Sequence, residues 1–393
     1  MRSLKRALNH LKPLRKNNRT PTMIMRVGDS PDREEDLVNR FDLHLSDTFI
    51  AFLAEEKISV AFTTYEAGKL IIVGPGQHKA TVTERNFERC MALHVEDDQN
   101  IFISTHHNIL QLENSLSPGD LHHGQWDRMY LPRSAFFTGG VDMHEIMRAK
   151  DGHLYGVVTG YNCIARIDHA ERGSFSPYWR PPFIDGVVPE DRCHLNGLCL
   201  DDDGELAYVT MVSTTNKAGA WKEHRDDGGV IMDVRTNEVV GSGLCMPHTP
   251  RLRDGVLWFL EAGKGYLCTL DVTTGEVERV LWRPGFLRGL HFYKNYAFIC
   301  CSAPRDQTFE GLPLDGELKK RNAEPRCALD VINLDTMEVE HSAEITGHVK
   351  EIYDVALLED CRQPILHGFF GEEIRKITVF GEDSSSLGAL KTR

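Results

Sequence analysis

The sequence predicts an all-β protein, a six-bladed β-propeller of four-stranded blades with a short N-terminal helix. Three observations lead to this prediction. Hairpin-like segments recur along the chain, they are spaced by about 50 residues, and a late strand-like segment can complete a first blade that lacks its own first strand. This spacing is within the range of propeller blades with four strands each.

The repeated unit is a short alternating strand, a polar turn that often ends in Asp-Gly or Asn, and an apolar strand. This pattern is typical of a β-hairpin. The units are CMALHVEDDQNIFISTH (90–106), MHEIMRAKDGHLYGVVT (143–159), HLNGLCLDDDGELAYVT (194–210), PHTPRLRDGVLWFLEAG (247–263) and LRGLHFYKNYAFICCSA (287–303). Several are followed by a third and a fourth strand, which indicates a whole blade.

The first blade needs a strand from the other end of the chain. ISVAFTTYEAGKLIIVG (58–74) supplies strands without an obvious first strand, and EIYDVALLED (351–360) supplies the missing one. Closing the ring in this way removes the strand edges that would otherwise invite aggregation. Six blades are therefore expected, because no segment provides a seventh.

The predicted organisation has four parts. Residues 1–30 form a basic, disordered tail, 31–57 a helical lead-in, 58–375 the propeller and 376–393 a C-terminal tail. Within the lead-in, SDTFIAFLAEEK (46–57) has the pattern of a short amphipathic helix, with Ser46 as its N-cap. We expect this helix to pack against the side or the base of the ring.

Charge excludes one class of partner. The net charge is −13, although residues 1–28 carry eight basic residues and no acid. So acidic a body would repel phosphates and argues against a nucleic-acid partner. The basic start resembles a transit-peptide-like or partner-binding arm, but a disordered tail, or a true start at Met23 or Met25, explains it more simply.

Cysteine usage and hydropathy indicate a cytoplasmic protein. The ten cysteines are scattered through apolar strands, and none forms a C-x-x-C pair. We interpret them as reduced, buried thiols in a reducing compartment. No apolar run is long enough to span a membrane.

The residues that begin the inner strands predict a site. In a propeller these strands line the central channel, so their first residues form a ring at one mouth. Aligning the units gives the ring positions Met91, His144, Asn196, His248, Arg288 and Asp354, with the polar neighbours Asp142, Glu145, His194 and Glu351.

Such a ring has the composition of a divalent-metal site. His144, Asn196, His248 and Asp354 are the expected ligands, for Zn, Fe, Mn, Cu or Ca. Alternatively, each histidine only satisfies hydrogen bonds at a strand start, and Asn196-Gly197 fits a tight turn into a strand equally well. No dinucleotide fingerprint is present, so no nucleotide cofactor is expected.

The remaining roles follow from side-chain chemistry. His194 or Glu351 is the expected general base, and Arg288 the group that stabilises an anion. The expected substrate contacts are Asp142, Arg251, Lys264, Trp221 and Tyr353. Two long loops, 211–229 and 302–326, should lie over the ring, with Trp221, Lys217, Arg305 and Phe309 reaching inward.

Seven motifs resemble a mainly bacterial family described as domain of unknown function 4915, or conserved hypothetical family 03032. The motifs are TTYEAGKL (63–70), WRPPFI (179–184), EDRCHLNGL (190–198), MPHTPR (246–251), LWFLEAGKGYL (257–267), PGFLRGL (284–290) and EIYDV (351–355). The resemblance covers roughly residues 45–370. It implies a propeller and brings no established reaction.

A more distant resemblance is to six-bladed lactonase and strictosidine-synthase-like propellers. These are expected to hold a metal at the channel mouth through acidic and amide side chains. HLNGLCLDDDGELAYVT is similar to their Asn-Gly segment. The present chain has histidines where that group has carboxylates, which puts both calcium and lactonase chemistry in doubt.

Two functions fit these observations. The first is a metal-dependent enzyme that acts on a small, anionic substrate, by hydrolysis of an ester or lactone or by metal-based oxidation. The second is a non-catalytic propeller that binds a peptide, sugar or protein partner at its rim. No G-x-S-x-G motif is present, which argues against a serine hydrolase.

Overall fold

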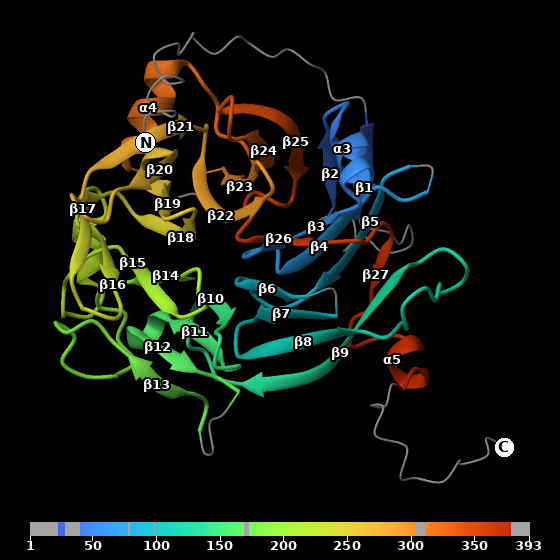
Figure 1. Cartoon of the computed structure of the whole chain (residues 1–393), viewed down its shortest axis with the longest axis horizontal. Coiled ribbons are helices and arrows are strands. Elements are labelled where there is room, and N and C mark those ends of the chain that lie inside the picture. The colour runs from blue at the N-terminus through green and yellow to red at the C-terminus, as the bar shows by residue number, and fades with distance from the viewer. Residues whose placement is uncertain are drawn as a thin grey trace.

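The computed structural model describes residues 23–27, 40–77, 79–97, 99–168, 173–303 and 311–378. In this part of the chain the strands form six sheets, which surround a central channel like the blades of a propeller (Figure 1). The predicted fold class is therefore confirmed. The basic segment 1–22 and the end of the C-terminal tail, 379–393, lie outside the described residues.

In blades 1 to 3 the four strands follow one another from the channel outward. Blade 1 consists of β26 (Val355–Leu358), β3 (Ser59–Thr64), β4 (Lys69–Gly74) and β5 (Thr81–Asn86). Blade 2 consists of β6 (Leu93–Glu96), β7 (Asn100–Ser104), β8 (Asn108–Asn114) and β9 (Arg128–Phe137). Blade 3 consists of β10 (Met143–Arg148), β11 (Leu154–Val158), β12 (Cys163–Arg166) and β13 (Ser176–Trp179).

Blades 4 to 6 have the same order of strands. Blade 4 consists of β14 (Leu195–Leu200), β15 (Leu206–Met211), β16 (Gly229–Asp233) and β17 (Val239–Leu244). Blade 5 consists of β18 (Pro247–Arg253), β19 (Val256–Glu261), β20 (Tyr266–Leu270) and β21 (Val277–Trp282). Blade 6 consists of β22 (Phe286–Tyr293), β23 (Tyr296–Ser302), β24 (Ala328–Asn333) and β25 (Glu338–Gly347).

The ring closes through blade 1, as predicted. The late strand β26 pairs antiparallel with β3, and Val355 lies opposite Phe62. Both strands are buried along their whole length. The first blade is thus built from both ends of the chain.

Two blades carry additional strands at their outer edges. β2 (Phe41–Leu45) pairs with β25, and β1 (Met23–Val27) pairs with β2, which extends blade 6. β27 (Pro364–Leu366) pairs parallel with β9 of blade 2. The lead-in to the propeller therefore contains a strand as well as a helix.

The predicted N-terminal helix is α3 (Phe49–Glu56), but Ser46 is not its cap. The N-cap residue is Thr48, which makes no side-chain capping bond. Ser46 Oγ instead accepts a hydrogen bond from the Ser342 amide at 3.1 Å. The hydroxyl is therefore used to attach the helix to blade 6, where Phe52 joins the apolar core.

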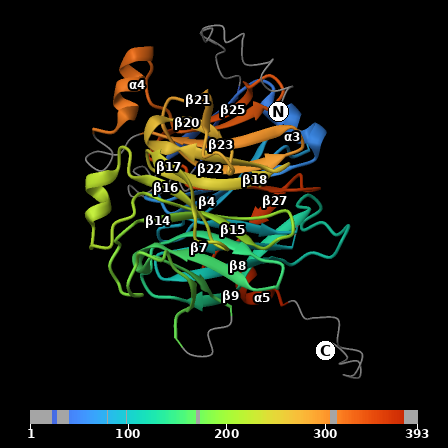
Figure 2. The ribbon, with the colours of Figure 1, turned by 60° about the vertical axis from the view of Figure 1, so that its left-hand side comes forward.

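The other helices of the described residues are short and lie outside the ring of inner strands. They are α4 (Pro313–Arg321), α5 (Glu373–Lys376) and the 3₁₀ helices η2 (Thr159–Tyr161), η3 (Ala220–His224) and η4 (Ala262–Lys264). α4 projects beyond the sheets of blades 5 and 6 (Figure 2). All ten cysteines are free and buried, as predicted.

Neighbouring blades pack through apolar faces, and the inner strands approach closely. Val157 of blade 3 and Val209 of blade 4, for example, belong to one core. Gly197, at the start of β14, lies directly against blade 5. A Cβ atom at this position would be 2.5 Å from Pro250 Cδ and 2.9 Å from the Thr249 nitrogen. The Asn-Gly pair therefore has a packing role at its second residue.

Replacement of Gly197 by alanine should destabilise the protein, by about 1–3 kcal/mol, because a methyl group there overlaps the next blade. The matched control is Gly316→Ala in α4, where a Cβ atom would meet nothing within 4 Å. Alanine is the better helix former, so this variant should be more stable by about 0.5–1 kcal/mol. Urea unfolding measures both; equal effects of the two substitutions would contradict the packing argument.

Candidate functional site

The predicted ring residues come together at the channel mouth where the inner strands begin. They line a small cavity of about 10 Å³, which has room for about one water molecule. Its lining residues are His144, Glu145, Asn196, His248, Thr249, Arg288, Tyr353 and Asp354. Met91 lies just before β6 and is not among them.

A repeated backbone turn presents three of these side chains. The residue just before the inner strand is left-handed in blades 3, 4 and 5, with φ of 56° at Asp142, 52° at His194 and 49° at Met246. Two residues later come His144, Asn196 and His248. Left-handed backbone is unfavourable for residues with side chains, and such strain collects at functional sites.

The turn also fixes the orientation of two imidazoles. His144 Nδ1 is 3.0 Å from the Asp142 carbonyl, and His248 Nδ1 is 2.9 Å from the Met246 carbonyl. A carbonyl oxygen only accepts, so Nδ1 carries the proton and Nε2 has the lone pair. Asn196 Nδ2 donates to His248 Nε2 at 2.9 Å. The lone pair of His248 is therefore held by the amide.

His194 is placed by different partners. Its Nδ1 is 2.7 Å from Asp191 Oδ2, and its ring stacks on Trp221 with centroids 4.1 Å apart. The imidazoles of His194 and His144 are arranged edge to face, with their centroids 5.1 Å apart. Trp221 belongs to the long loop between β15 and β16, so this loop contacts His194. Arg305 and Phe309 of the second loop lie outside the described residues.

Arg288 lies between two aromatic rings at the same mouth. Its guanidinium carbon is 4.8 Å from the Tyr353 ring and 5.1 Å from the Phe286 ring. Aromatic faces stabilise a guanidinium ion and hold its plane. Glu351 is buried in the segment that leads to Tyr353. A permanent positive charge therefore borders the cavity.

The middle of the channel is occupied by a buried ion pair. Glu145 on β10 meets Arg251 on β18 through two contacts, of 3.3 and 3.4 Å. Arg251 also donates to the carbonyls of Leu198 and Leu290. The predicted substrate contact Arg251 is thus fully engaged within the protein.

Lys264 lies apart from the ring. Its Nζ is 2.7 Å from Glu261 Oε1, and Arg279 Nε is 2.5 Å from the other oxygen of Glu261. None of these three residues lines either channel cavity. Lys264 therefore supports blade 5 in this structure.

Burial keeps the two mouth histidines neutral. It lowers the pKa of His144 to about 4 and that of His248 well below its usual value, with Arg288 adding to both effects. Burial, with the charge of Glu145, raises the pKa of Asp354 to about 7. Both oxygens of Asp354 accept backbone amide hydrogen bonds, from Leu93 and from Val355, each at 2.9 Å.

The pKa of Asp142 is shifted in the opposite direction to that of Asp354. Burial alone would raise the pKa of its carboxyl, but His144, His194, Arg89 and Arg288 outweigh this effect and lower it.

The described residues contain no group of three His, Cys, Asp or Glu side chains arranged to hold a metal. Any metal at the ring would therefore need Asn196 or a rearranged side chain as a further ligand.

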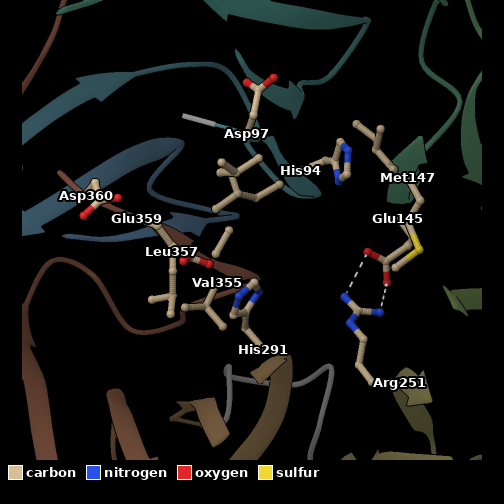
Figure 3. A pocket seen from close by; sticks show the side chains of 14 residues that line it. His94, Asp97, Glu145, Met147, Arg251, His291, Val355, Leu357, Glu359 and Asp360 are labelled. Carbon is tan, nitrogen blue, oxygen red and sulfur yellow. Dashed lines mark hydrogen bonds and ion pairs between the residues drawn. The ribbon is translucent and has the colours of Figure 1, made fainter. Parts of the chain in front are cut away.

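Sequence reasoning missed a larger cavity, which begins beyond the ion pair and opens where the inner strands end (Figure 3). His94 on β6 and His291 on β22 line it. A signal was present, because both lie in a Leu-His-apolar triplet shortly before the hairpin turn of their blade, Leu93–Val95 and Leu290–Phe292.

Replacement of Arg251 by methionine should cost about 3–5 kcal/mol of unfolding free energy at pH 8, because it leaves the Glu145 carboxylate buried without its partner. Burial already raises the pKa of Glu145. Protonation should therefore reduce the loss at pH 5. The double variant Arg251→Met/Glu145→Gln should recover most of it at pH 8; equal losses in the single and double variants would refute this explanation.

The neutral state of His144 predicts a pH dependence. The imidazole takes up a proton near pH 6.5 when the chain is unfolded, but only near pH 4 in the fold. Acid thus favours the unfolded state, so the contribution of His144 to stability is lost as the pH falls from about 6.5 to about 4. The unfolding free energy of wild type minus that of His144→Gln should decrease over this window. A difference independent of pH would contradict the burial argument.

Three solved structures are among those to which the chain is similar. A nidogen/laminin complex structure is matched with a TM-score of 0.50 and 11% identity, over 77% of this chain and 99% of that one. A protein of unknown function from Bacteroides caccae is matched with a TM-score of 0.46 and 11% identity, over 76% of this chain and 98% of that one. Virginiamycin B lyase from Staphylococcus aureus is matched with a TM-score of 0.38 and 12% identity, over 82% of this chain and 99% of that one.

No functionally curated protein matches the chain. None of the helices in the described ranges combines the length and the apolar character needed to cross a membrane. The family model described as domain of unknown function (DUF4915) matches residues 47–366, which is most of the chain and all six blades. The chain belongs to this family.

Proposed function

We propose that the ring is the substrate site of an enzyme that acts on a small anionic molecule with the help of a divalent metal. The observation that carries the proposal is the anchoring of His144 and His248 through Nδ1. Metal-binding histidines almost always donate their other ring N–H to a carbonyl or a carboxylate, which orients the ring and fixes the tautomer.

The donor chemistry fits a borderline metal. Neutral imidazole suits Zn, Fe, Mn or Cu, and the lowered pKa values keep both rings able to bind a metal in mild acid. Rotation of the Asn196 amide would present its oxygen in place of the Nδ2–H that now meets His248. Asp354 is a weaker candidate, because both of its oxygens accept amide hydrogen bonds.

The other residues take the roles predicted from sequence. A bound metal would act as a Lewis acid on an ester or lactone carbonyl. Arg288 holds the anionic group of the substrate. His194, oriented by Asp191, accepts a proton, with Glu351 as the alternative base. Trp221 covers this arrangement, so the substrate enters when the loop between β15 and β16 moves.

Elemental analysis after dialysis tests the metal directly. We expect about one equivalent of Zn, Fe, Mn, Cu or Ca in the purified protein, and less than about a tenth of that in His144→Ala and in His248→Ala, because each removes an imidazole ligand. The matched control is His348→Ala, which removes an exposed histidine and should retain the metal. Turnover of small carboxylated lactones and esters, lost in Arg288→Gln, tests the reaction.

Folded, metal-free protein that turns over none of these compounds would contradict the enzyme proposal. That result would favour the second candidate, a non-catalytic propeller that binds a peptide, sugar or protein at its rim. One observation supports this candidate: His144, Asn196, His248 and Arg288 are all buried around a cavity of about 10 Å³. A rim binder needs no opening of the ring.

A further inference from the structure

The cavity at the other end of the channel has the size of a small-molecule site. Its volume is about 560 Å³, and pockets for organic ligands measure about 300–1,000 Å³. The Glu145–Arg251 pair separates it from the ring. Figure 3 shows this pair at one side of the cavity, with Asp97 and Asp360 away from it. The cavity is therefore distinct from the ring and opens on the opposite face.

Half of the residues that line this cavity are apolar. These are aliphatic and thioether side chains from three inner strands: Leu93, Val95, Ile146, Met147, Val355, Ala356 and Leu357. A ligand that leaves water for such a surface gains roughly 25 cal/mol for each Å² of apolar area that is buried. The body of the ligand is therefore expected to be apolar.

Two histidines provide hydrogen-bond acceptors inside the cavity. His94 Nε2 is buried and has no hydrogen-bond partner among the described residues. Burial lowers the pKa of His94 and of His291 to about 4, with Arg251 contributing to both. Near pH 7 each ring is neutral and offers one nitrogen lone pair. A ligand with N–H or O–H donors would satisfy them.

The mouth of the cavity is negatively charged. Asp97, Glu359 and Asp360 line it and are exposed. In the part of the chain that the structure describes, no ion pair involves any of the three. The one basic side chain in the lining is Arg251, which is already paired with Glu145. The charge that a ligand meets is therefore negative.

We propose that this cavity binds a small organic cation, an amine with an apolar body. The ammonium group lies at the mouth with Asp97, Glu359 and Asp360, and the body contacts the aliphatic walls. Donor groups of the ligand bind His94 and His291. This site is independent of the metal and substrate roles proposed for the ring.

Calorimetric titration of the full chain with three probes of similar size tests the charge preference. The probes are 2-phenylethylamine, 2-phenylethanol and 3-phenylpropionate. We expect the amine to bind at least about tenfold more tightly than the alcohol, and the carboxylate not to bind. Added salt should weaken binding of the amine, because the mouth carboxylates are solvent-exposed and salt screens their charge.

Matched variants locate the site. The double variant Glu359→Gln/Asp360→Asn should lower the affinity for the amine by about three- to tenfold, in keeping with the modest strength of exposed ion pairs. Asp202→Asn/Asp203→Asn removes the same charge from the exposed hairpin turn of blade 4, outside the cavity, and should leave affinity unchanged. Val95→Trp, at a half-buried lining position, should abolish binding while the thermal unfolding midpoint stays close to that of wild type.

Three results would overturn the proposal. They are no binding of the amine, equal binding of all three probes, or equal losses in the two charge variants. If Val95→Trp fails to fold, the charge variants still decide, because their substitutions lie at the surface. His248→Ala should bind the amine as wild type does, so failure of the ring proposal is distinguishable from failure of this one.

Discussion

The antiparallel pairing of β26 with β3 is the constraint on which the rest of the structure depends. It joins Val355, near the C-terminal end of the propeller, to Phe62, near its N-terminal end, and turns an open row of blades into a ring. The entropy cost of such a distant contact grows only slowly with separation, and closure removes two sheet edges. The residue before β26, Asp354, also accepts the Leu93 amide of blade 2. Both channel cavities therefore exist only once this strand is in place.

The Glu145–Arg251 pair is the second organising contact, and it is local. Arg251 belongs to blade 5, its carboxylate partner to blade 3, and its carbonyl partners Leu198 and Leu290 to blades 4 and 6. One guanidinium thus links four inner strands across the axis. A buried pair is tolerated only when further hydrogen bonds satisfy its charges. The carbonyls of Leu198 and Leu290 accept from the guanidinium, and the Leu198 backbone also bonds the Glu145 carboxylate. The pair therefore fixes the channel geometry and blocks passage through it.

The sequence predicted what depends on periodicity and missed what depends on pairing. The hairpin repeat located the blades, the closing strand and the convergence of His144, Asn196 and His248, because alternation and turn residues are local signals. The prediction of Ser46 as a helix N-cap was wrong, and nothing in the sequence indicated the partner of Lys264. A hydroxyl or an ammonium group forms hydrogen bonds with whichever polar groups the fold brings near it. The second cavity was missed although the Leu-His-apolar triplets of blades 2 and 6 are a local signal, because its size depends on side-chain packing between blades.

The two channel ends differ in how their ligands would be recognised. The protein is acidic overall, at −13, so an anion approaching the ring is repelled until Arg288 is within its reach, whereas a cation approaching the other mouth is attracted throughout. Repulsion over distances beyond about 8 Å is screened at physiological salt, so it slows encounter more than it weakens a closed complex. A loop that contacts the ring, as the loop of Trp221 does through His194, suits the first case. An open mouth with exposed carboxylates suits the second. Glu145 lines both cavities, and its pairing with Arg251 keeps the two ends of the channel separate.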